Sequence, residues 1–150
     1  MYKRQFIVIG AGLIFGSLLV SLLTRKGNKL FLSILGGLGM AAGLAAVGTL
    51  QPESMSWFGA VVVVGFSSGF FVVPLNAHLQ DQIEESHRGR VLSAQNLMGS
   101  FSGIVAIVAS SLMKLMGLSV SVQTLVFVPL LIVVSYVLSR MLKSSALKAI

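Results

Sequence analysis

A few polar side chains inside otherwise apolar segments are the groups of this chain that could bind a ligand. Pro74 interrupts one apolar segment and is followed by Asn76 and His78, while Gln95 and Asn96 lie early in the next segment. Proline cannot donate a backbone hydrogen bond inside a helix, so a kink or local unwinding is expected at Pro74. The pattern predicts a site for substrate binding or gating, built from amide and imidazole groups. The alternative is a simple kink whose polar neighbours lie at a membrane surface.

The residue types needed for catalysis or metal binding do not cluster in the sequence. The chain has no cysteine, only two histidines and only four acidic residues, and none of the acidic residues lies within an apolar segment. Neither a nucleophile with its base, nor paired carboxylates, nor a set of metal ligands can be assembled from the spacing. The sequence therefore predicts a protein that is not an enzyme and that uses neither a cofactor nor a metal.

A short charged crossing, DQIEESHRGR, separates the two segments that carry the candidate site. Glu84 and Glu85 precede Arg88 by four and three residues, so they could pair with it if this turn were helical, and Arg90 follows. The four residues are either a solvated loop with weak ion pairs or a cytoplasmic latch that breaks and reforms as the protein moves.

The composition is that of a membrane protein. Hydrophobic residues make up 55% of the 150 residues and charged residues only 10%, against roughly a quarter in soluble domains. Each apolar segment is near the ~20 residues that cross a bilayer as a helix. The sequence predicts an all-α polytopic membrane bundle forming one domain over residues 1–150, with a tail at 143–150. Its five transmembrane helices are expected at about residues 5–23, 30–50, 57–80, 91–116 and 122–142. Glycines spaced by three or four, as at Gly36, Gly39 and Gly43 or Gly99 and Gly103, predict close helix packing.

The net charge of +7 indicates membrane topology rather than a nucleic-acid partner, because the basic residues lie in short clusters between apolar segments. One side of the predicted membrane layout would hold most of them, in the sequence positions Arg25, Lys26, Lys29, Arg88, Arg90, Arg140, Lys143 and Lys148. The positive-inside rule then predicts a cytoplasmic C-terminus and an external N-terminus. An external N-terminus without a preceding helix leads us to expect a partial chain, whose partners are the bilayer and either missing N-terminal helices or another membrane chain.

The segment GSLLVSLLTRKGNK resembles the degenerate repeat of the cytoplasmic loop signature of the major facilitator superfamily. Gly16, Arg25, Gly27 and Lys29 match that signature, and Thr24 stands where the family often has aspartate. The layout of the whole chain is similar to the last five helices of such a transporter, without the first helix of its C-terminal half. The resemblance implies a partial major facilitator fold.

A second resemblance involves PLNAHLQ and RGRVLSAQNL, at residues 74–80 and 88–97. These are similar to the lysophospholipid transporter branch of the superfamily, and to the transporter-like domain fused to acylglycerophosphoethanolamine acyltransferases. The resemblance implies movement of lysophospholipid across the bacterial inner membrane by alternating access. The alternative is an accessory or truncated membrane protein that does not transport and acts by packing its helices against a partner.

Overall fold

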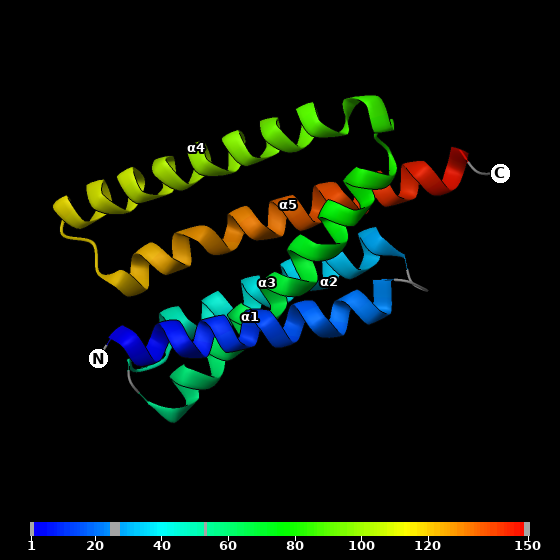
Figure 1. The fold of residues 1–150 in the computed structure, drawn as a ribbon. Helices are drawn as coiled ribbons and strands as arrows, with labels where there is room; N and C mark the ends of the chain where they lie inside the picture. The colour runs from blue at the N-terminus through cyan, green and yellow to red at the C-terminus, as the bar shows by residue number, and fades with distance from the viewer. Residues whose placement is uncertain (1, 25–27, 53, 149–150) are drawn as a thin grey trace.

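The backbone is helical almost throughout. The computed structural model describes residues 2–24, 28–52 and 54–148, and within these residues it contains no strand. The helices are α1 (Tyr2–Thr24), α2 (Lys29–Thr49), α3 (Met55–Asp81), α4 (Arg88–Leu115) and α5 (Val120–Lys148), with a 3-10 turn, η1 (Glu85–His87), before α4 (Figure 1). The predicted all-α helix bundle is confirmed.

The helices extend beyond the predicted apolar segments. Helix α4 begins at Arg88, so the basic end of the crossing forms its first turn. Helix α5 continues to Lys148, through most of the residues expected as a tail, because this stretch contains no proline or glycine that would stop it. Helix α3 stays helical across Pro74, so the local unwinding considered for this position is absent.

Short connections make successive helices antiparallel. Asn28 caps α2 by accepting a hydrogen bond from the Phe31 backbone nitrogen at 3.2 Å, and Ser54 caps α3 in the same way through Trp57. Gly117, with φ of 78°, follows the end of α4, where a left-handed residue is common. One end of the bundle, here the crossing end, therefore holds Asn28, η1 and the last turns of α5, and the far end holds residues 50–52, 54 and 116–119 (Figure 1).

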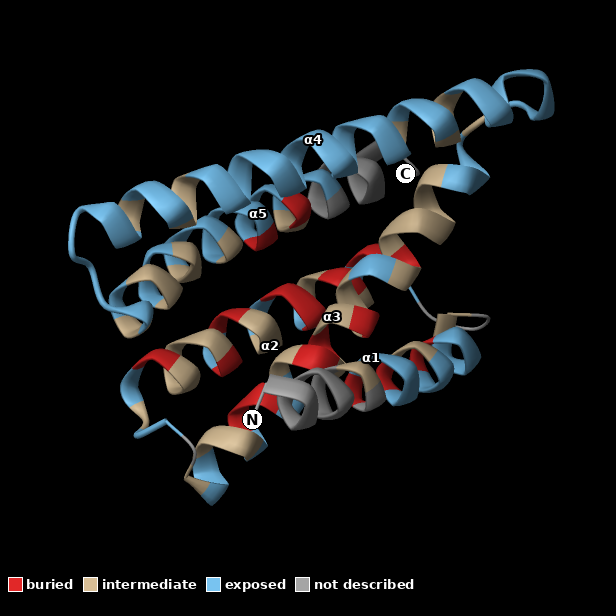
Figure 2. Ribbon diagram, turned by 60° about the vertical axis from the view of Figure 1, so that its left-hand side comes forward, coloured by how far each residue is buried: buried red, intermediate tan, exposed pale blue. Residues whose placement is uncertain are grey.

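Helix α3 packs tightly against both α1 and α2, and α5 packs against α2. A Cβ atom at Gly16 would overlap the backbone of Phe66, and one at Gly36 would overlap the backbone of Phe70 and Phe71. Glycine at these positions lets the helix backbones approach closely, as expected in lipid. The buried residues accordingly lie mainly where α1, α2 and α3 meet (Figure 2).

Helix α4 differs from the others because none of its residues is buried (Figure 2). Large apolar side chains such as Leu97, Phe101 and Ile107 are 67–73% exposed. A Cβ atom at Gly99 or Gly103 would meet no atom within 4 Å, so the small residues of α4 make no close helix contact in the described structure. Such an apolar helix would be unfavourable in water and is suited to lipid or to protein neighbours in a membrane.

The lengths and apolar compositions of the helices identify a multi-pass membrane protein. Within the described residues, four stretches are long and apolar enough to span a bilayer: Lys29–Thr49, Met55–Asp81, Glu85–Leu115 and Val120–Met141. In α1, the described apolar stretch, Gly12–Thr24, is shorter.

Candidate functional site

A cavity of about 380 Å³ at the crossing end brings together residues from four helices. Helix α3 contributes most of its polar wall, and α4 contributes one amide. Its lining residues are Leu30, Leu75, Asn76, His78, Leu79, Gln82, Gln95, Leu138 and Met141. The described lining residues are mainly apolar and include no lysine, arginine or carboxylate, so they offer hydrogen bonds rather than a fixed charge.

The Asn76 and Gln95 amides join α3 to α4 across this cavity. Gln95 Nε2 donates to Asn76 Oδ1 at 2.5 Å, in a partly buried position. Among the described residues, this is the only side-chain hydrogen bond between α4 and another long helix. Asn76 and Gln95 are nineteen positions apart in the chain, and the antiparallel arrangement of α3 and α4 brings them together.

His78 lies on the same wall, one turn before Gln82. The two Nε2 atoms of His78 and Gln82 are 3.2 Å apart, so the Gln82 amide can donate to a neutral imidazole. The imidazole of His78 and the amides of Asn76, Gln82 and Gln95 therefore line one largely apolar cavity.

Three of the five residues predicted for the binding site, Asn76, His78 and Gln95, line this cavity together. Pro74 does not line it, because its side chain is fully buried in the packing of α3. Asn96 is exposed and also lies outside the lining, since one residue on a helix turns the side chain by about 100° away from Gln95.

Sequence reasoning missed Gln82 and the contributions of α2 and α5, which are Leu30, Leu138 and Met141. Gln82 follows the end of α3 at a spacing of four from His78, and this spacing could have indicated the contact. The three apolar residues carry no comparable signal, because only the packing of the helices decides which leucines and methionines border the cavity.

The crossing forms a different contact from the ion pairs predicted for it. Glu84 Oε2 lies 3.6 Å from His87 Nδ1, and neither Glu84 nor Glu85 pairs with Arg88 within the described chain. The expected spacing required a continuous helix, whereas Glu85–His87 form a 3-10 turn and α4 begins only at Arg88. The described residues likewise place no ion pair on Arg90, which is exposed.

An ion pair that the sequence did not predict lies at the same end, between Lys29 at the start of α2 and Asp81 at the end of α3. Both side chains are partly exposed, so the pair is screened and contributes at most about 1 kcal/mol to stability. The antiparallel order of α2 and α3 could have indicated it. Lys29 belongs to the predicted loop signature, whose Gly16 packs against α3, while Arg25 and Gly27 lie outside the described residues.

Together, the cavity, the Asn76–Gln95 hydrogen bond and the Lys29–Asp81 ion pair form a site suited to non-covalent binding. The described residues contain no cluster of His, Cys, Asp or Glu that could hold a metal ion. Amides, an imidazole and apolar side chains can hydrogen-bond a polar group while they accommodate an apolar one. Gln95 both lines the cavity and forms the hydrogen bond that joins α4 to α3.

Comparison with known proteins identifies the family. The sequence model of the Major Facilitator Superfamily matches residues 5–107, a range that includes most of α1, all of α2 and α3 and most of α4. The searches of curated proteins and of solved structures gave no match. The family match covers more than half of the chain, and the described helices are those of a multi-pass membrane protein. The chain therefore belongs to the Major Facilitator Superfamily of membrane transporters.

Proposed function

We propose that this chain takes part in moving lysophospholipid across the bacterial inner membrane by alternating access, with the lipid head group bound in the Asn76–Gln95 cavity. The observation that carries the proposal is the hydrogen bond between these two amides at a mainly apolar cavity shared by four helices. The similarity of residues 74–80 and 88–97 to the lysophospholipid transporter branch supports the choice of substrate.

The chemistry of the lining suits an amphiphile. Asn76, Gln95 and His78 offer both donors and acceptors to a zwitterionic head group such as that of lysophosphatidylethanolamine. Leu30, Leu138 and other apolar residues of the lining would contact the glycerol and the first part of the acyl chain. Because the described lining residues include no lysine, arginine or carboxylate, none of these groups has to be buried as an unpaired ion when the site is empty.

The same contacts suggest how binding would be coupled to movement. A head group that hydrogen-bonds Gln95 would replace the Gln95–Asn76 bond and so release α4 from α3. The crossing between these helices would then have to bend. Glu84, Glu85, Arg88 and Arg90 are exposed there and form our proposed cytoplasmic latch, which exchanges partners as α4 moves.

Translocation in proteoliposomes tests this function. We expect the wild-type chain to speed the movement of fluorescent lysophosphatidylethanolamine between leaflets, measured by its accessibility to a membrane-impermeant quencher. Gln95→Ala and Asn76→Ala should each slow this movement about tenfold, because each removes a hydrogen-bonding group from the cavity. Gln80→Ala is the matched control, since it removes an exposed amide of α3 that does not line the cavity.

Two results would contradict the proposal. Wild-type activity in both cavity variants would remove the cavity from the transport path. A wild-type chain that leaves lysophospholipid movement at the rate of protein-free vesicles would instead favour a second function, helix packing against a partner membrane chain. The absence of any buried residue on α4, together with the open space at Gly99 and Gly103, supports that second candidate.

A further inference from the structure

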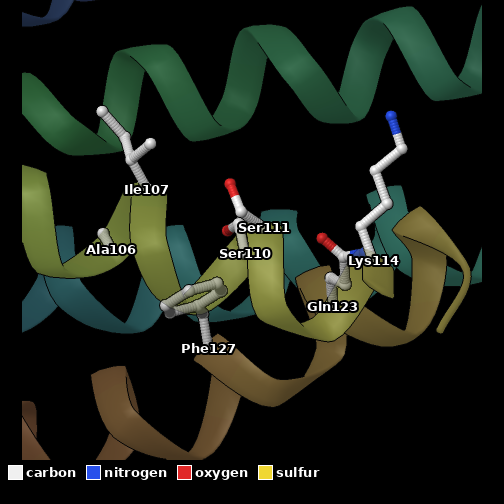
Figure 3. Close-up of a pocket in the computed structure, with 7 residues that line it drawn as sticks. All are labelled: Ala106, Ile107, Ser110, Ser111, Lys114, Gln123 and Phe127. Carbon is white, nitrogen blue, oxygen red and sulfur yellow. The ribbon is translucent and has the colours of Figure 1, made fainter. Parts of the chain in front are cut away.

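A second cavity, of about 450 Å³, lies between α4 and α5 near the far end of the bundle. Figure 3 shows Phe127 of α5 directed toward α4, and Ile107, Ser110, Ser111 and Lys114 are the α4 lining residues discussed below. We call this cavity the Lys114 groove. It is separate from the Asn76–Gln95 cavity, and the two share no lining residue. Ser110 follows Gln95 by fifteen positions, which corresponds to ~22 Å along α4 at 1.5 Å per residue.

Three polar side chains of the Lys114 groove, those of Lys114, Ser110 and Ser111, have no partner among the described residues, whereas Gln123 donates from Nε2 to the Leu118 carbonyl oxygen at 3.0 Å. The Lys114 amine forms no ion pair or hydrogen bond with any described residue, and the hydroxyls of Ser110 and Ser111 form none either. Ser110 and Ser111 precede Lys114 by four and three residues, so the three groups share one face of α4 (Figure 3). One ammonium and two hydroxyls are therefore available together to an anionic ligand.

The other part of the groove is apolar. Ile107 lies one turn further from the helix end than Ser110 and Ser111, and Phe127 borders the groove from α5 (Figure 3). Lys114 is the penultimate residue of α4, so its long side chain can reach the membrane surface while the apolar part of the groove lies deeper. The order of charged and apolar groups thus follows the order of head group and acyl chain in a lipid.

We propose that the Lys114 groove binds a single-chain amphiphile that carries a phosphate. The phosphate pairs with Lys114 and accepts hydrogen bonds from Ser110 and Ser111, while the chain lies against Ile107 and Phe127. Several phosphate oxygens can use these three donors at once, whereas a carboxylate offers only two oxygens. The inference concerns binding alone, and it goes beyond the proposed transport because it adds a site at the opposite end of α4 from the transport cavity.

Photocrosslinking of the purified full-length chain in maltoside micelles tests the groove. The probe is lysophosphatidic acid with a diazirine in its acyl chain, and mass spectrometry locates the labelled residues. We expect labelling within residues 106–127, reduced about tenfold by Lys114→Gln, which removes one charge-assisted hydrogen bond. Lys114→Arg should retain most of the labelling. Arg140→Gln is the matched control, because it removes an exposed positive charge of α5 near the crossing end.

Competition distinguishes a lipid from a free ion. Unlabelled lysophosphatidic acid should compete with the probe, while inorganic phosphate and monoacylglycerol should each compete at least tenfold more weakly, because each lacks half of the proposed contacts. Equal competition by inorganic phosphate would show an ion site, and equal competition by monoacylglycerol would show that the phosphate is not recognised. Either result, or undiminished labelling in Lys114→Gln, overturns the proposal.

The same measurement separates this site from the transport function. Gln95→Ala, which is expected to slow transport, should leave labelling of residues 106–127 unchanged, since Gln95 does not line the groove. Loss of that labelling in Gln95→Ala would also overturn the proposal, because the groove would then depend on the other cavity. Transport that fails while the groove still labels would contradict only the proposed function.

Discussion

Individual polar residues have unequal roles in this chain because burial and partners differ among them. Asn76 and Gln95 satisfy each other across two helices, whereas the Ser135 hydroxyl, on a residue that is 2% exposed, has no hydrogen-bond partner among the described residues. Ser135 lies against Gly37, where a Cβ atom would overlap its hydroxyl oxygen. The small size of both residues, rather than a hydrogen bond, therefore explains why α5 can pack closely on α2.

At the residue scale, this predicts an unusual response to loss of the Ser135 hydroxyl. Ser135→Ala should leave the free energy of unfolding unchanged or raise it by up to about 1 kcal/mol, because it removes an unsatisfied buried polar group. Ser33→Ala is the comparison, since Ser33 is equally buried but donates to the Lys29 carbonyl oxygen at 3.2 Å. It should lose about 1 kcal/mol. Thermal unfolding in detergent micelles measures both variants. A larger loss of stability in Ser135→Ala than in Ser33→Ala would contradict the conclusion that the Ser135 hydroxyl has no hydrogen-bond partner.

At the scale of the elements, glycines with the same sequence spacing have different structural surroundings. Gly36 on α2 touches the backbone of α3, while Gly103 on α4 has open space around it. The sequence pattern predicted tight packing for both helices, and only α2 has it within this chain. Since neighbouring backbone cannot move aside as a side chain can, the α2–α3 contact should tolerate no added methyl group.

The prediction at this scale is a contrast between two identical substitutions. Gly36→Ala should lower the free energy of unfolding by about 2 kcal/mol, in the range found for overpacked cores. Gly103→Ala should leave it unchanged or raise it slightly, because alanine has the higher helix propensity and the added methyl group meets nothing. Thermal unfolding of both variants, under the same detergent conditions, makes the comparison. Equal stabilities would show that α2 and α3 are further apart than described.

At the scale of the whole molecule, the alternating helices place Asn28, η1 and the last turns of α5 at one end (Figure 1). The layout predicted from the sequence placed these same segments on the side of the membrane that holds most of the basic residues. The side of the membrane that the crossing end faces follows only from the positive-inside rule and stays a prediction. That rule predicts a cytoplasmic crossing end.

Single cysteines test the membrane orientation, because the natural chain has none. Gln51→Cys and Met116→Cys at the far end should react with an impermeant maleimide added to intact cells. Ser86→Cys at the crossing end should react only after permeabilisation. All three positions are exposed, so access to solvent within the protein does not limit the reaction. The reverse pattern would contradict the predicted orientation.

The sequence alone determined the helical class, the antiparallel order and the candidate polar residues. Hydrophobic length and short connections suffice for these features, since both are properties of the chain itself. It also predicted one site made of Pro74, Asn76, His78, Gln95 and Asn96, and the structure places only three of these five residues, Asn76, His78 and Gln95, at one cavity.

Tertiary structure decided which side chains meet. Whether Asn96 or Gln95 faces the cavity depends on the rotation of α4, and the pairing of Lys29 with Asp81 depends on how α2 lies against α3. Neither of these two contacts follows from the local spacing of residues. The expected Glu84–Arg88 pair does not form, because the local turn is a 3-10 turn. The Lys114 groove was equally hidden, because its residues come from two helices whose relative placement is a property of packing.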